Sequence, residues 1–84
     1  MMFSLSFSNQ SEKFLKKCDK GLKKRILEKI KNLRMEPVPH NAVSVVGEER
    51  TFRIRIGDYR ILYEVKWDNQ EILIAIIDKR SRAY

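Results

Sequence analysis

Hydrophobic residues follow two different periods along the first half of the chain, and each period predicts a different element. Residues 2–8 alternate between apolar and polar side chains, which is typical of a strand with one buried face. From 13 to 33, apolar residues recur every three or four positions among lysines, which is the spacing of an amphipathic helix. Gly21 interrupts this stripe, so we expect a helical hairpin over roughly 9–19 and 22–35.

Strand periodicity returns in the last third of the chain, where two short polar turns separate three apolar segments. Residues 51–56 and 59–66 alternate on either side of the turn dipeptide Gly57-Asp58, and a strongly apolar segment covers 71–78. This pattern predicts an antiparallel meander of three strands. The stretch 36–50 contains two prolines and a short apolar run, and we interpret it as a connection between the helices and the meander.

The order of these elements predicts an α+β fold. An N-terminal strand is followed by a helical hairpin and then by a three-stranded antiparallel meander, and we expect the helices to pack on one face of the sheet. The length of 84 residues suits one small domain, so residues 1–84 are interpreted as a single domain. A hydrophobic content of 43% is enough for a packed core and argues against a disordered chain.

The first turn of the meander predicts an unusual pair of charges. A two-residue turn at Gly57-Asp58 places Arg55 directly opposite Arg60, and alternation puts Arg53 on the same face, away from the apolar side chains. Like charges that face each other across a sheet destabilise it by up to about 1 kcal/mol, and no carboxylate in this register compensates for them. A bound anion would do so, because guanidinium groups match phosphate oxygens. The alternative interpretation is a solvated sheet face with no ligand.

The second turn predicts how the last strand lies beside its neighbour. A regular hairpin centred on Asp68-Asn69 brings oppositely charged ends together and extends the apolar face. The expected neighbours are Lys66 and Glu71, Tyr63 and Ile74, and Ile61 and Ile76.

The net charge points to an anionic partner. Eighteen Lys and Arg against eleven Asp and Glu give a net charge of +7 and an isoelectric point near 9.8, which favours a nucleic acid or an acidic protein surface. Arg80 follows the last strand and extends the arginine cluster, while the lysines of the helices add a field that attracts a polyanion. The residues that we expect to contact RNA without reading its sequence are Lys13, Lys16, Lys20, Lys23, Lys24, Lys79 and Arg82.

Several classes of protein are excluded by what the chain lacks. Cys18 and His40 are each the single residue of their type, so neither an internal disulfide nor the three or four ligands of a zinc site can be assembled. No apolar run approaches the roughly 20 residues of a membrane span, and the first residues do not form a signal peptide. We therefore expect a cytoplasmic protein that uses no metal, no cofactor and no membrane.

Residues 51–65 combine two alternate arginines, a short turn and the motif Tyr-Arg-Ile-Leu-Tyr, and residues 77–84 end in Arg-Ser-Arg-Ala-Tyr. Together these segments resemble the RelE family of toxins from bacterial and archaeal toxin–antitoxin pairs, within the RelE/ParE superfamily. The resemblance implies a fold like that of microbial ribonucleases. It also implies an endoribonuclease that enters the A site of the 30S subunit, cleaves the mRNA there and stops translation. The implied partner is a cognate RelB-type antitoxin that wraps the toxin and blocks it.

The resemblance also assigns candidate catalytic residues, which are Arg53, Arg55, Arg60, Arg80 and Tyr84. In the implied reaction the 2′-OH attacks the adjacent phosphorus and the arginines stabilise the growing negative charge. Arg80 would donate to the leaving oxygen, and Tyr84 would either stack on a base or deprotonate the 2′-OH. Several family members carry lysine where this chain has Arg53 and Arg55. Because arginine does not titrate near neutral pH, these two positions favour charge stabilisation over proton transfer.

Two other functions fit the same pattern of residues. The basic surface could serve a non-catalytic module that binds RNA or the ribosome. The same fold could also carry a ParE-like inhibitor of gyrase, although the basic cluster and the late tyrosine favour the nuclease.

Overall fold

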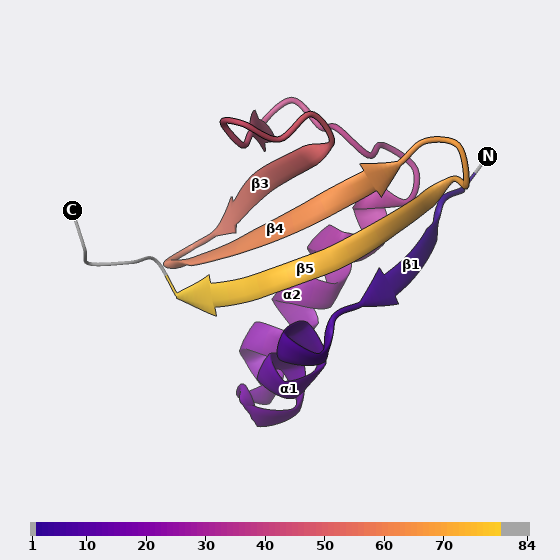
Figure 1. The fold of residues 1–84 in the computed structure, drawn as a ribbon. Coiled ribbons are helices and arrows are strands. Elements are labelled where there is room, and N and C mark those ends of the chain that lie inside the picture. Colours follow the sequence, from indigo (N-terminus) through magenta and orange to yellow (C-terminus); the bar gives the residue numbers. More distant parts are fainter. Residues whose placement is uncertain (1, 80–84) are drawn as a thin grey trace.

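The structure, a computed structural model, describes residues 2–79 and contains one five-stranded sheet and two helices (Figure 1). Arg80, Arg82 and Tyr84, which the sequence places in the candidate site, lie outside the described residues. The strands are β1 (Ser4–Phe7), β2 (Val43–Ser44), β3 (Thr51–Ile56), β4 (Tyr59–Lys66) and β5 (Glu71–Lys79), and the helices are α1 (Asn9–Lys17) and α2 (Lys20–Leu33). The predicted α+β fold with a helical hairpin is confirmed.

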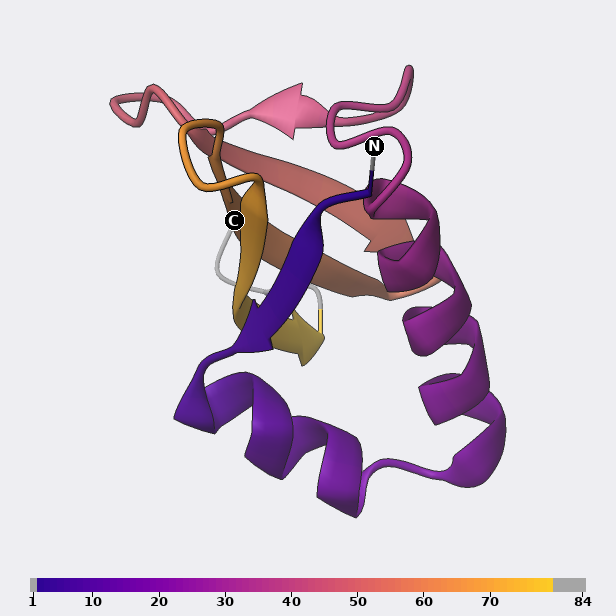
Figure 2. The same ribbon diagram turned by 90° about the vertical axis from the view of Figure 1, so that its right-hand side faces the viewer.

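The sheet has the strand order β1-β5-β4-β3-β2. The first strand runs parallel to β5, and the other neighbours are antiparallel. Figure 2 shows both helices on the same side of the sheet, as the sequence predicts. The short strand β2 was missed, because it forms within the segment 36–50 that the sequence analysis interprets as a connection. It adds a fourth antiparallel strand beside β3 and extends that edge of the sheet.

The helical hairpin breaks at Cys18 and Asp19, the residues that cap its two helices. Cys18 and Asp19 both have extended backbones, with ψ of 161° at each residue, and they end α1 and precede α2. The Asp19 carboxylate accepts the Leu22 N–H at 2.9 Å, which satisfies one of the free amides at a helix start. Gly21 lies inside α2, so the break comes two residues earlier than the interruption of the apolar stripe.

Replacing Asp19 by alanine is expected to lower the free energy of unfolding by about 1 kcal/mol, because the Leu22 N–H loses its acceptor. Urea titration followed by circular dichroism measures this change. Glu28→Ala is the matched control, since Glu28 is an exposed acidic residue in the middle of the same helix, and it should change stability by less than about 0.5 kcal/mol. Equal losses in the two variants would contradict the capping role.

The hydrophobic core lies between α2 and the sheet. Spacings of three and four residues bring one apolar face of α2 onto the strands, and burial of each large aliphatic side chain contributes about 1.5–3 kcal/mol. Tyr63 is the largest fully buried side chain, and its hydroxyl donates to the Pro37 carbonyl at 2.7 Å. The fully buried aliphatic residues are Ile26, Ile30, Leu33, Ile54, Ile61, Val65, Ile72, Ile74 and Ile77.

The β3–β4 hairpin has the predicted register, with Arg55 opposite Arg60. Gly57 begins its turn with φ of +57°, a left-handed conformation that glycine adopts without strain. Two residues are thus enough to connect the strands. This short turn leaves no freedom for the strands to slip, so the face of every following residue is determined.

The β4–β5 hairpin departs from the predicted register halfway along. Lys66 pairs with Glu71 and Tyr63 with Ile74, as expected. The prediction that Ile61 lies beside Ile76 was wrong, because Ile61 pairs with Ile77. A β-bulge explains the difference: Leu62 pairs with Ile76 and Tyr63 with Ile74, so Ala75 has no partner of its own on β4. From the bulge onwards, every residue of β5 is displaced by one position relative to β4.

Within residues 2–79, neither helix combines the length and hydrophobicity that a transmembrane helix requires.

Candidate functional site

Three arginines share the face of the sheet that lies opposite the helices. Ile54 and Ile56 point into the core, so alternation along β3 turns Arg53 and Arg55 to the other side. Arg60 joins them from β4, directly across from Arg55. We call these three residues the arginine face. The sequence prediction of a shared face is confirmed, and it follows from the apolar alternation and the two-residue turn.

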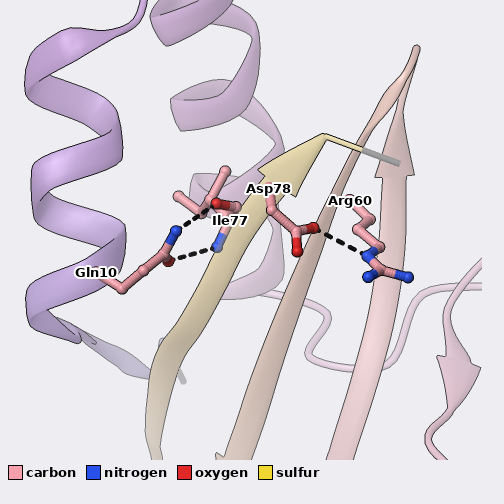
Figure 3. Close-up of polar contacts among 4 residues, drawn as sticks. All are labelled: Gln10, Arg60, Ile77 and Asp78. Atoms are coloured by element: carbon pink, nitrogen blue, oxygen red, sulfur yellow. Dashed lines mark hydrogen bonds and ion pairs between the residues drawn. The ribbon is translucent and has the colours of Figure 1, made fainter. Parts of the chain in front are cut away.

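An aspartate of the same chain neutralises part of this face. Arg60 Nε donates to Asp78 Oδ1 at 2.9 Å, and the two side chains are 23% and 39% exposed (Figure 3). The prediction that no carboxylate lies beside the arginines was therefore wrong. The error arises from the bulge at Ala75, which moves Asp78 into register with Arg60 on β4. Three arginines against one aspartate still leave a positive surplus at this end of the sheet.

A hollow of about 370 Å³ lies beside two of these arginines. Arg53, Arg60 and Leu62 contribute to its lining from the sheet, and the segment 43–46 supplies an apolar wall. Val46 in this wall is 99% exposed. The wall is the part of the site that sequence reasoning missed, and its signal was the short apolar run inside the stretch interpreted as a connection.

Arg53, which lines this hollow, carries an unsatisfied donor. Its Nε is buried and has no hydrogen-bond partner among the described residues. Leaving a buried donor unpaired costs about 1–3 kcal/mol, and the cost is removed when a ligand supplies an acceptor. Phosphate oxygens are suitable acceptors, because a guanidinium group donates to them with charge-assisted hydrogen bonds. The hollow therefore has the chemistry of an anion site with an apolar side.

The structure brings only part of the predicted set together. Arg53 and Arg60 line one hollow, while Arg55 is exposed on the same face next to Arg60. Lys79 pairs with Tyr59, so alternation places it on the side of the sheet that carries the helices, away from the arginine face.

The lysines predicted to contact RNA lie on the helices, on the opposite side of the sheet from the arginines. They are exposed, and those of α2 surround a shallow hollow of about 480 Å³ together with Leu27. Because the sheet separates them from the arginine face, they form a separate positive surface. The predicted residues of this surface are Lys13, Lys16, Lys20, Lys23 and Lys24.

Metal-ligating side chains do not gather anywhere in residues 2–79: no group of three or more His, Cys, Asp or Glu side chains is placed to hold an ion. The guanidiniums of the arginine face donate hydrogen bonds and positive charge but do not exchange protons near neutral pH. The arrangement can bind and stabilise an anion.

Known proteins share both the sequence and the fold. The family model described as "ParE toxin of type II toxin-antitoxin system, parDE" matches residues 5–84. The chain is 31% identical over 87 residues to RelE1 of Methanocaldococcus jannaschii, covering 100% of this chain and 97% of that protein. RelE in the archaeal RelE–RelB complex from Pyrococcus horikoshii superposes with a TM-score of 0.82 at 32% identity, over 99% of this chain and 100% of that one. The isolated E. coli RelE toxin has the same fold, with a TM-score of 0.85 at 17% identity over 96% of this chain and 87% of that one.

Proposed function

Since the chain belongs to the RelE/ParE family of toxins from type II toxin–antitoxin systems, we propose that it inhibits translation as a ribosome-dependent endoribonuclease. It would enter the A site of the 30S subunit and cleave the mRNA there, acting in the cytoplasm without a metal or cofactor. The observation that carries this proposal is the hollow lined by Arg53 and Arg60, together with the buried Arg53 Nε, which has no partner among the described residues. A phosphate of the mRNA backbone would supply the missing acceptor.

The proposed reaction is an attack of the ribose 2′-OH on the adjacent phosphorus, with departure of the 5′-oxygen of the next nucleotide. The phosphorus passes through a state with extra negative charge on its oxygens. Arg53, Arg55 and Arg60 would stabilise that charge, which is usually the largest contribution that a site can make. Because arginine keeps its protons, these residues act by charge and hydrogen bonding.

Two further roles fall on residues outside the described part of the chain. Arg80 is proposed to donate to the leaving oxygen, and Tyr84 to stack on the exposed base or to deprotonate the 2′-OH. Both assignments come from the family resemblance. We also propose that Lys79, Arg82 and the lysines of the helices contact RNA or the ribosome. The described lysines among them lie away from the arginine face, which suits a partner that surrounds the protein on two sides.

A RelB-type antitoxin is the proposed protein partner. The solved RelE of Pyrococcus horikoshii forms a complex with RelB, and it is 32% identical to this chain over nearly its whole length. The net charge of +7 favours an acidic partner, since opposite charges accelerate encounter and select against other proteins.

A ParE-like inhibition of gyrase is the second candidate function. The family model that matches the chain is that of the ParE toxins, and the same fold serves both branches of the family. Unlike mRNA cleavage, gyrase inhibition does not need a phosphate-binding hollow, so the arginine face favours the nuclease.

Primer extension on mRNA bound to programmed ribosomes tests the proposal. We expect new cuts within the codon in the A site when the protein is added, and intact mRNA when ribosomes are left out. An uncleaved message on ribosomes would contradict the nuclease. Salt-dependent ribosome binding without cleavage would support a non-catalytic module, and loss of supercoiling in a gyrase assay would support the ParE-like function.

A further inference from the structure

We propose that Asp78 is a positioning residue that holds the Arg60 guanidinium ready for the scissile phosphate. The inference rests on the proposed nuclease function. A carboxylate at a phosphate-binding site would be expected to weaken phosphate binding, since it repels the phosphate. Its geometry suggests the opposite role, because the carboxylate binds Arg60 Nε from the side of β5 at 2.9 Å.

The bond to Nε uses one corner of the guanidinium. An arginine has five N–H donors in a planar fork, and the ion pair to Asp78 engages the donor nearest the aliphatic stem. This bond fixes the plane of the fork. Arginine has a large rotamer entropy, so a side chain that is oriented before the ligand arrives loses less freedom when the phosphate binds.

The position of Asp78 is itself held by α1. Beyond Phe7, β1 no longer covers the outer edge of β5, and the first turn of α1 takes its place. The Gln10 amide donates to the Ile77 carbonyl at 2.8 Å and accepts the Ile77 N–H at 3.0 Å (Figure 3). One side chain thus satisfies both backbone groups of the residue before Asp78, as a neighbouring strand would.

The bulge is anchored in the same way. The Ser8 hydroxyl donates to the Ala75 carbonyl at 2.6 Å, and the buried Ser11 hydroxyl donates to the Ile74 carbonyl at 3.0 Å. Together with Gln10, these contacts fix the backbone of β5 on both sides of the extra residue. The bulge, and with it the pairing of Asp78 with Arg60, is therefore built into the packing of α1 on the sheet.

Because the ion pair is partly exposed, its contribution to folding stability can be distinguished from its contribution to the cleavage rate. Pairs of this exposure contribute little to folding stability, because water screens them. A structural role would thus leave only a small effect, whereas misplacement of a group that stabilises the transition state reduces the rate strongly. If Asp78 only neutralised Arg60, its removal would strengthen phosphate binding and speed the reaction. Removal of Asp78 therefore slows cleavage if Asp78 positions Arg60, and speeds cleavage if Asp78 only neutralises it.

Single-turnover cleavage on programmed ribosomes tests the inference with Asp78→Ala, Asp78→Asn and wild type. At saturating ribosomes we expect the rate constant to fall roughly 10- to 100-fold in Asp78→Ala, and less in Asp78→Asn, which keeps an oxygen acceptor. Ribosome affinity should change less than about twofold, and the midpoint of thermal unfolding should fall by no more than about 4–8 °C. Asp68→Ala is the matched control, because Asp68 is an exposed aspartate in the β4–β5 turn, and its rate should equal that of wild type.

Nuclear magnetic resonance of the Arg60 Nε–H gives a second readout that does not depend on cleavage. We expect slow hydrogen exchange in wild type and fast exchange in Asp78→Ala. Rates that stay equal or rise in Asp78→Ala would overturn the positioning role while leaving the nuclease intact. Failure of wild type to cleave would overturn the nuclease, and the positioning role with it.

Discussion

Replacing Arg60 by alanine is expected to reduce mRNA cleavage on ribosomes by about 100- to 1,000-fold, the usual effect of removing one group that stabilises a developing oxyanion. Arg60 lies where the positive charges converge, opposite Arg55 and at the edge of the hollow that also contains Arg53. The loss should appear in the rate constant at saturating ribosomes, since the interaction strengthens as charge develops on the phosphate. Quantitative primer extension at several ribosome concentrations measures it.

Arg25→Ala is the matched control for this experiment. Arg25 is an exposed arginine of α2 on the other side of the sheet, so its removal changes the net charge equally without touching the arginine face. We expect its rate at saturating ribosomes to stay within about twofold of wild type. Arg60→Lys keeps the charge but loses the planar fork, and it should restore only part of the activity. Comparable losses in Arg25→Ala and Arg60→Ala would show that net charge alone explains the effect.

A loss of cleavage activity in Arg60→Ala should not result from a loss of folding stability. The side chain lies on the open face of the sheet and its aspartate partner is partly exposed, so we expect the free energy of unfolding to fall by no more than about 1 kcal/mol. Circular dichroism and urea unfolding of the purified variant check this. A variant that fails to fold would instead indicate a structural role for the arginine.

The sequence predicts the arginine face because local rules determine it. A two-residue turn and strict alternation leave a single register for the β3–β4 hairpin, and Arg55 opposite Arg60 follows by counting. The helical hairpin is equally local, since the apolar stripe and a capping aspartate mark its elements. For these parts of the fold, residues close in sequence carry all the necessary information.

The partner of Arg60 could not be predicted in the same way. It depends on the bulge at Ala75, and nothing in the β5 sequence, such as a glycine, marks an extra residue there. The contacts that anchor it come from Ser8 and Ser11, more than 60 residues earlier in the chain. Counting along one hairpin therefore placed Asp78 one position away from where it lies.

The wall of the hollow was missed for a related reason. Only Val43 and Ser44 form the strand β2, and both are exposed, so neither alternation nor burial distinguishes them from a loop. Their pairing with β3 depends on a free strand edge that exists only after the sheet has formed. The sequence thus predicts the charged part of the site well and its apolar part poorly.

Raising the pH from 10 to 12 is expected to remove about 2 kcal/mol of folding stability through Tyr63 alone. The side chain is fully buried and its hydroxyl donates to the Pro37 carbonyl. Burial raises the pKa of Tyr63 to about 12 from 10.0 in the unfolded chain, because the phenolate loses its hydration inside the core. Between these values the unfolded chain releases the proton and the folded protein keeps it. The stabilisation is therefore complete below pH 10 and is lost as the pH rises through 12.

Tyr63→Phe isolates this effect, because lysines and the other tyrosines titrate in both proteins. Near pH 8 the variant should be less stable by about 1 kcal/mol, since the Pro37 carbonyl loses its donor. As the pH rises the difference should shrink and then change sign, so that the variant is the more stable protein near pH 12. Urea unfolding of both proteins at half-unit steps from pH 8 to 12 measures the crossing. If the unfolding free energies of the two proteins changed in parallel over that range, the Tyr63 hydroxyl would be in contact with water in the folded protein. The hydrogen bond to the Pro37 carbonyl would then not shield it from solvent.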